Sequence, residues 1–138
     1  DIDALLAGLQ DGTIDVVVSD HQPQDEESKN LEFDQAEFGA LGLETAFGVL
    51  NTYQKKHLSL EDLIDKITHQ PRQILNLPPV SIKVGVEANL TLFDAQKTWT
   101  VQEKTKSKSK NSPFVGKTLT GKPIAVFRSG QTNWQTKG

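Results

Sequence analysis

The spacing of apolar positions changes along the chain, and the change falls near residue 80. Residues 3–10 have the spacing of a helix, and Asp11-Gly12 after them is a stop and turn signal. Residues 14–19 then contain three consecutive valines in a β-branched run, which is typical of a strand buried on both faces. Helix, tight turn and buried strand form an α/β unit, so we expect this strand to run parallel to strands outside this chain.

Three more helices are expected before residue 80. Residues 41–56 carry apolar side chains at a three-to-four spacing, namely Leu43, Ala46, Phe47, Leu50 and Tyr53. Ser59 is expected to cap the next helix, with Asp62 three residues later forming a capping box. Pro71 restarts a short third helix, which Pro78-Pro79 ends.

After residue 80 the pattern becomes that of strands. Residues 84–94 are expected to be a turn leading into a strand, and residues 99–102 a second strand. Two further runs, 117–119 and 124–128, bracket a turn signal at 120–123 and predict a hairpin. We therefore expect an α/β region over residues 1–80 and a β-rich region over residues 81–138.

Composition narrows the classes of protein. The 138 residues suit one domain, and no apolar run approaches the length of a membrane helix. No secretory leader opens the chain, so we expect a cytoplasmic protein without membrane contact. The absence of cysteine excludes disulfides, thiolate nucleophiles and cysteine metal sites, and three histidines are too few for a self-contained polyhistidine site.

Two features indicate a piece of a longer protein. The sequence has no methionine, and its helical pattern begins at the first residues; trimming of the chain would explain the same facts. Charge is also uneven, at −11 over residues 1–50, +1 over residues 51–100 and +7 over residues 101–138. Such asymmetry indicates two regions with different neighbours, or two ends of one larger surface.

The strongest candidate for chemistry is segment 19–23, Ser-Asp-His-Gln-Pro, at the end of the predicted strand. The carboxyl ends of parallel strands are where α/β proteins build active sites. A carboxylate at that place, here Asp20, can bind a metal or move a proton. The alternative is that Asp20 caps the following turn and that His21 is solvated.

Other charged segments are weaker candidates. The acidic loop 21–38 could attract a cation, but it lacks the spacing of a calcium loop, and a solvated loop is the simpler interpretation. Lysines alternate with Ser and Thr over residues 104–110, where phosphate contact competes with a solvated, mobile loop. His57 and His69 have no partner of matching spacing and are expected to be ordinary surface histidines. No phosphate-binding glycine loop, nucleophile elbow or His-Glu-x-x-His motif is present, and we expect no nucleic-acid partner.

The order of several short motifs is more specific than any one of them. It resembles the C-terminal part of the dihydroorotase family of the amidohydrolase superfamily. The motifs that carry the resemblance lie at residues 3–15, 19–23, 38–46, 85–94 and 111–116, with Asn89 in place of the superfamily's Asp. Together with Gly130 they extend the resemblance over nearly the whole chain.

The resemblance implies an α/β fold, namely the last strand and helices of a (β/α)8 TIM barrel followed by part of a small β-sandwich. It implies a metal-dependent enzyme, with one or two zinc ions in the full-length parent, that interconverts carbamoyl-aspartate and dihydroorotate in pyrimidine synthesis. Residues 14–19 would be the eighth barrel strand, with Asp20 as catalytic residue and metal ligand. Zinc lowers the pKa of bound water, and a neighbouring carboxylate can hold the proton released. Gln24, Phe38 and Gly39 would border the small-molecule substrate.

Two departures from the family pattern keep alternatives open. Gln24 stands where the family has a histidine that helps hold the substrate carboxylate, and a neutral amide offers a weaker bond than a cation. The family's other metal ligands would lie upstream of this chain, in the remaining N-terminal part of the parent. The family also has zinc-free, non-catalytic members that are structural partners of aspartate carbamoyltransferase. We therefore keep a catalytic dihydroorotase, a non-catalytic dihydroorotase-like subunit and a freestanding small binding protein as hypotheses, with a homo-oligomer or aspartate carbamoyltransferase as partner.

Overall fold

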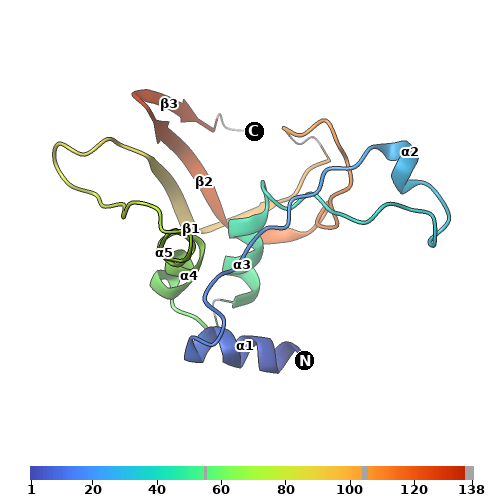
Figure 1. The fold of residues 1–138 in the computed structure, drawn as a ribbon. Helices are drawn as coiled ribbons and strands as arrows, with labels where there is room; N and C mark the ends of the chain where they lie inside the picture. Colours follow the sequence, from blue (N-terminus) through green and yellow to red (C-terminus); the bar gives the residue numbers. More distant parts are fainter. Residues whose placement is uncertain (55, 104–105, 136–138) are drawn as a thin grey trace.

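The computed structural model of the chain describes residues 1–54, 56–103 and 106–135. A helical part precedes a sheet in chain order (Figure 1). The helices are α1 (Ile2–Asp11), α2 (Glu26–Lys29), α3 (Ala46–Gln54), α4 (Leu60–Ile67) and α5 (His69–Ile74). The strands of the sheet are β1 (Leu90–Thr100), β2 (Thr118–Arg128) and β3 (Gln131–Trp134). No helix within the described residues is long and apolar enough to cross a membrane.

Helix α1 confirms the prediction over residues 3–10. It ends at Gly12, whose φ of 84° is the left-handed conformation that glycine adopts without steric cost. The chain then folds back, because the amide of Ile14 donates to the carbonyl of Gly8 at 2.8 Å. The Ile14 side chain covers Gly8, where an added Cβ would lie 3.1 Å from it.

The strand expected over residues 14–19 is not formed. This segment is a connection without a ladder partner among the described residues, and Val18 is 75% exposed. It is attached to α4 instead, since the amide of Val17 donates to the carbonyl of Lys66 at 3.2 Å. The Nζ of Lys66 donates to the carbonyl of Ile14 at 2.7 Å. A strand exists only by pairing, and the described part of this chain places no second strand beside these residues.

The helices after residue 40 follow the sequence signals closely. Helix α3 begins at Ala46, later than the expected start at residue 41, after a turn over residues 43–45. Ser59 caps α4 as predicted, accepting from the amide of Asp62 at 3.1 Å and donating to its carboxylate at 2.7 Å. Helix α5 begins at His69, so Pro71 lies in its first turn, where the missing N–H has no helical partner to lose.

The three strands form one antiparallel sheet in the order β1-β2-β3. Two expectations are wrong here. The strands expected over 84–94 and 99–102 are one strand, β1, with a register shift between Asp94 and Thr98. The hairpin turn expected at 120–123 is absent, because β2 continues through it and the reversal comes at Ser129-Gly130. The glycine and proline of that signal mark an irregularity in a strand rather than its end.

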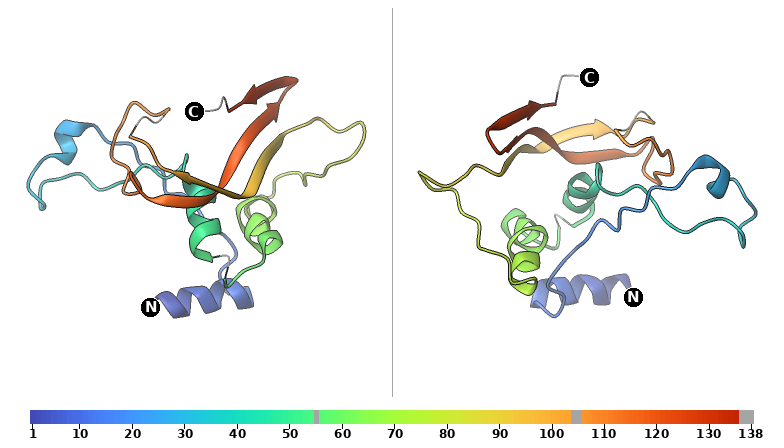
Figure 2. Two further views of the ribbon diagram at one scale, coloured as in Figure 1. Left: turned by 180° about the vertical axis from the view of Figure 1, so that it is seen from behind. Right: turned by 45° about the horizontal axis from the view of Figure 1, so that its top comes forward.

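Helix α3 packs against the sheet and makes the most extensive contact between a helix and a strand among the described residues (Figure 2). The rings of Phe47 and Phe93 lie 4.7 Å apart, and Asn51 donates to the carbonyls of Ala95 and Thr120, both at 2.9 Å. Gly121 lies directly opposite, with a φ of 96° and no room for a side chain. The buried apolar side chains of the described residues are Leu41, Leu58, Leu63, Val101, Leu119 and Ala125.

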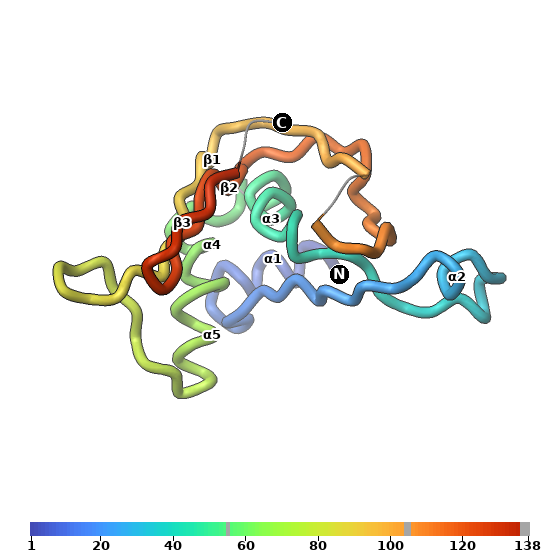
Figure 3. The backbone as a smooth tube through the Cα atoms, turned by 90° about the horizontal axis from the view of Figure 1, so that it is seen from above, coloured from blue at the N-terminus to red at the C-terminus, as the bar shows by residue number. Residues whose placement is uncertain are grey.

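The rest of the molecule is open. Two long segments, one bearing α2 and one leading from α5 into β1, extend away from the body in opposite directions (Figure 3). The accessible surface is 10453 Å², against about 7,100 Å² expected of a folded monomer of 15.2 kDa. Large apolar side chains such as Ile2, Phe33 and Ile82 are more than two-thirds exposed. Much apolar surface is therefore left uncovered within this chain.

Candidate functional site

Three segments far apart in sequence meet just after the connection 14–19. His21 and Ala40 form a parallel bridge, in which the amide of Gln22 donates to the carbonyl of Ala40 at 3.0 Å. Asn111 lies against both segments and bonds to each of them. We call this junction, residues 20–24, 38–42 and 111, the bracket.

Asp20 stands at the start of the bracket with its side chain exposed. Its φ is 43°, the left-handed region that Asp and Asn tolerate better than most residues. Its Oδ1 accepts from the side-chain amide of Gln22 at 2.8 Å. Among the hydrogen bonds of the described residues, no backbone amide donates to this carboxylate. Asp20 therefore differs from an ordinary turn cap and presents its carboxylate outward.

His21 is half-buried and bonded, in contrast to the alternative of a solvated side chain. Its Nδ1 accepts from the amides of Gly42 and Leu43, each at 3.2 Å. This nitrogen can accept only while it carries no proton. The close approach needs Gly42, where an added Cβ would overlap the carbonyl oxygen of Ser19. No signal in the sequence pointed to this role.

The residues expected at the substrate lie together in the bracket but on both of its arms, the first being residues 20–24 and the second residues 38–42. Gln24 donates from Nε2 to the carbonyl of Phe38 at 2.9 Å, while the Phe38 ring is 87% exposed. Gly39 has a φ of 123°, and a Cβ there would lie 2.7 Å from the Cβ of Gln22. The close approach of Gln22 therefore already requires a glycine at position 39, independently of any substrate.

Asn111 is the bracket residue that sequence reasoning missed, although its motif was noted. Its Nδ2 donates to the carbonyls of Gln22 at 3.0 Å and Gly39 at 3.3 Å. Its Oδ1 accepts from the amide of Gln24 at 3.3 Å, and its own carbonyl accepts from the amide of Leu41 at 3.2 Å. These contacts span 70 to 89 residues, so no local pattern could reveal them.

The acidic loop 21–38 is more ordered than the sequence suggested, because it contains α2. Asp25 caps this helix by accepting from the amide of Ser28 at 2.7 Å. That bond holds the pKa of the Asp25 carboxyl below its usual value. A similar bond from Thr13 lowers the pKa of Asp11.

The lysine-rich segment is partly anchored by an acid. Glu44 accepts through Oε1 from the amides of Lys106 and Ser107, at 2.8 and 3.1 Å. Lys104 and Thr105, the other residues of this part of the predicted mobile loop, lie outside the described residues. His69 also has a partner that the sequence reading missed, since its Nδ1 lies 3.2 Å from the carboxylate of Asp65 one turn earlier.

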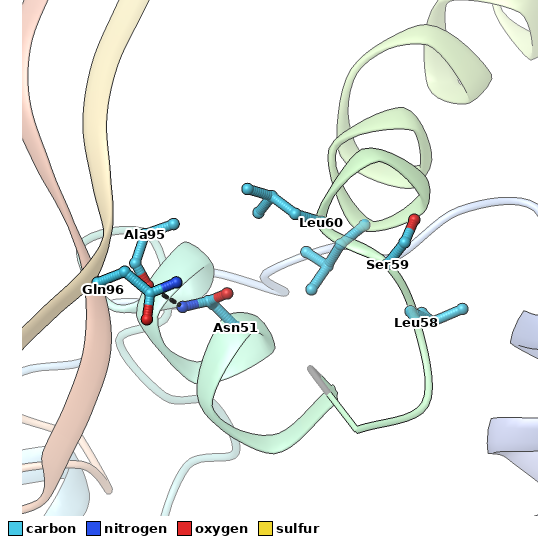
Figure 4. Close-up of a pocket in the computed structure, with 7 residues that line it drawn as sticks. Asn51, Leu58, Ser59, Leu60, Ala95 and Gln96 are labelled. Atoms are coloured by element: carbon cyan, nitrogen blue, oxygen red, sulfur yellow. Dashed lines mark hydrogen bonds between the residues drawn. The ribbon is translucent and has the colours of Figure 1, made fainter.

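A cleft away from the bracket separates α4 from β1 (Figure 4). It is lined by Asn51, Leu58, Ser59, Leu60, Leu63, Ala95 and Gln96. Two of its polar side chains have structural partners, because Asn51 bonds to the sheet and Ser59 caps α4. The cleft is part of the packing between helices and sheet, and it offers no acid, base or nucleophile for chemistry.

The described residues lack a complete set of metal ligands. Across residues 1–54, 56–103 and 106–135, no group of three His, Asp or Glu side chains comes together in a way that could hold a metal ion. Asp20 is one carboxylate, and Nδ1 of the adjacent His21 is already engaged by two amides. A zinc site uses at least three protein ligands. The described residues thus supply at most part of such a site.

Comparison with known proteins identifies the class. The sequence model of the amidohydrolase family matches residues 1–132, and the chain belongs to this family. Within it, the chain is 48% identical over 136 residues to a dihydroorotase of Carboxydothermus hydrogenoformans. The match covers 96% of this chain and 32% of that protein. The predicted resemblance to dihydroorotase is therefore confirmed, and the chain spans about a third of the length of these relatives.

Solved structures agree on the architecture. An L-hydantoinase (dihydropyrimidinase) from Arthrobacter aurescens matches with a TM-score of 0.84 and 30% identity, covering 97% of this chain and 32% of that one. An inactive dihydroorotase-like domain of a Chaetomium thermophilum CAD-like multifunctional protein matches with a TM-score of 0.67 over 98% of this chain and 37% of that one. At 20% identity the second likeness shows a shared fold only.

Proposed function

We propose that this chain is the C-terminal part of a dihydroorotase, which opens and closes the cyclic amide of dihydroorotate to give and consume carbamoyl-aspartate. The identity of 48% to a dihydroorotase, over almost the whole chain, is the observation that carries the proposal. In the complete parent, where neighbouring strands can pair with them, residues 14–19 would form the eighth strand of a barrel. Residues 1–80 would end that barrel, and residues 81–138 would belong to a small β-sandwich. The working protein is cytoplasmic and completed by the N-terminal part of its own chain.

In this proposal Asp20 holds the proton of the water that attacks the amide carbonyl. Support comes from its exposed carboxylate, held through Oδ1 by Gln22. A zinc ion would add the polarising charge, and Asp20 would be one of its ligands. Because the described residues hold no complete metal site, the other ligands would come from the rest of the parent.

Gln24, Phe38 and Gly39 line the substrate side in this proposal. The exposed Phe38 ring offers an apolar face to a flat ring, and the backbone at Gly39 has no side chain to block it. Gln24 already donates one N–H to the carbonyl of Phe38, so its second N–H remains for a substrate carboxylate. That bond is neutral and weaker than one from a cation.

A non-catalytic dihydroorotase-like subunit, a structural partner of aspartate carbamoyltransferase, is the second candidate. Gln24 favours it, because a neutral amide replaces the family's histidine at the substrate carboxylate. The inactive dihydroorotase-like domain from Chaetomium thermophilum shows that this fold occurs without activity.

One experiment separates the candidates, and it uses the longer protein that carries this chain. We expect the parent to turn over dihydroorotate and Asp20→Ala to lower kcat by roughly 10²–10⁴-fold, the usual worth of a positioned acid–base group. Asp15→Ala is the matched control, since Asp15 is exposed on the same connection. Equal turnover in the parent and in Asp20→Ala would show that Asp20 has no catalytic role. A folded parent with no turnover, which binds aspartate carbamoyltransferase, would establish the non-catalytic subunit.

A further inference from the structure

We propose that Asn111 is a positioning residue that sets the distance between the two arms of the bracket, and so the placement of Asp20 and Gln24. Its effect on turnover rests on the proposed function, whereas its effect on the bracket does not. Asn111 touches neither a substrate nor a metal in this proposal. It acts through the backbone of the segments that carry the candidate site residues.

The side chain of Asn111 is used on both sides. Its two N–H groups bond to the carbonyls of Gln22 and Gly39, which belong to different arms. Its oxygen accepts from the amide of Gln24 on the first arm. The backbone carbonyl of Asn111 adds a bond to the amide of Leu41 on the second arm. One residue therefore makes four hydrogen bonds, two to each arm.

These bonds matter because they double the number that hold the arms in place. The arms share four direct bonds, namely that from the amide of Gln22 to Ala40, that from Gln24 to the carbonyl of Phe38, and the two at His21. Without Asn111, the carbonyls of Gln22 and Gly39 would each lose a hydrogen-bond donor. Gly39 alone keeps a second one, since Lys29 donates to its carbonyl at 3.3 Å.

The residue type follows from this geometry. The position needs one acceptor and two donors in a short planar group, which asparagine supplies. Aspartate has the same shape but no donor, and it would set a negative charge against two carbonyl oxygens. Alanine would leave all three partners of the side chain unpaired. Glutamine would extend the amide by one methylene group, beyond the present spacing.

The link from Asn111 to the candidate site is short. Asn111 holds the carbonyl of Gln22, and the side chain of Gln22 holds the carboxylate of Asp20. Asn111 also fixes the amide of Gln24, whose side chain bonds to the carbonyl of Phe38. A misplacement of a reacting group by about 1 Å can cost on the order of 10²-fold in rate. Loss of Asn111 should therefore lower kcat more than it raises KM.

The test uses the longer protein with Asn111→Asp and Asn111→Ala, and Asn133→Asp as matched control. Asn133 is exposed on β3, far from the bracket in sequence. We expect both Asn111 variants to lose hydrogen-exchange protection at the amide of Gln22, which bonds across the two arms to Ala40, and to lower kcat by about 10- to 100-fold. Asn111→Ala should also lose protection at the amide of Gln24, whose acceptor Asn111→Asp retains. The control should change neither quantity. Thermal unfolding, followed in parallel, separates a loss of folded protein from a change in the folded bracket.

Each outcome decides the proposal. Unchanged exchange at the amide of Gln22 in both variants would overturn it. Lost protection with unchanged kcat would show that the bracket does not control the chemistry, which also overturns the positioning role. If the unmodified parent has no turnover, the proposed function fails instead. The exchange measurement alone then decides whether Asn111 holds the bracket.

Discussion

The contact of α3 with the sheet and the connection 14–19 show opposite degrees of completion. At α3, Asn51 satisfies two backbone carbonyls, Leu119 is fully buried, and Gly121 leaves no free space. Along residues 14–19, two hydrogen bonds to Lys66 hold a run of valines, and Val18 is 75% exposed. Both regions are strongly apolar in sequence, so composition alone does not explain the difference.

The difference shows which region of the chain finds all its packing partners within the chain and which does not. Helix α3 finds its partners within 70 residues of itself, in β1 and β2. A strand with valines on both faces needs a neighbouring strand on each edge and cover on each side. The described residues provide neither. The accessible surface is larger than that of a folded monomer of this mass, which indicates that another part of the parent or a partner covers the exposed apolar side chains.

The largest expected effect on stability comes from disrupting the packing of α3 against the sheet. Gly121→Ala in the parent protein should lower the free energy of unfolding by about 2–5 kcal/mol, since it adds left-handed strain to overpacking against Asn51 and Phe47. Gly116→Ala is the control, because Gly116 has a φ of 78° but open space around it. It should show the strain alone, about 1–2 kcal/mol. Urea unfolding measures both, and equal losses would show that the contact is loosely packed.

A smaller effect should come from detaching the connection 14–19. Lys66→Met keeps the length of the side chain but removes the amine that donates to Ile14. We expect the free energy of unfolding to fall by about 1.5–3 kcal/mol, the range for a hydrogen bond to a charged group. Hydrogen exchange at the amide of Val17 should also speed up. Lys97→Met, at an exposed lysine of β1, is the control, and identical exchange in the two variants would contradict the attachment.

The smallest effect concerns His21, where the connection enters the bracket. His21→Ala removes the acceptor of two backbone amides, and we expect the free energy of unfolding to fall by about 1–2 kcal/mol. His21→Asn places an acceptor oxygen near the position of Nδ1 and should recover part of that loss. Unfolding midpoints of the two variants, compared with the unchanged protein, measure the difference. If asparagine restores nothing, the ring contributes by packing rather than by accepting.

Local signals in the sequence predicted local structure well. Ser59 with Asp62 located the start of α4, and Asp11-Gly12 located the end of α1, because caps and stops depend on a few neighbouring residues. The turn expected at 120–123 failed for the opposite reason. Gly121 is needed by the side chains of α3, which no local pattern contains.

The candidate site divides in the same way. Asp20 was proposed from its place at the end of an expected strand and from a resemblance, and Gln24, Phe38 and Gly39 from the resemblance alone. In the structure Gln24 bonds to the carbonyl of Phe38, and Asp20 bonds to Gln22. Their roles stay predictions until activity is measured. His21 and Asn111 escaped attention because their bonds join residues 21 to 89 positions apart.

The position of Asn111 in the chain also has a consequence in time. Gln24 and Asn111 are separated by 87 residues. At about 5–20 residues per second, a ribosome adds Asn111 some 4–17 s after Gln24. During that interval the two arms exist without the residue that joins them. The bracket therefore closes late in synthesis, after the helices between its arms and Asn111 have been made.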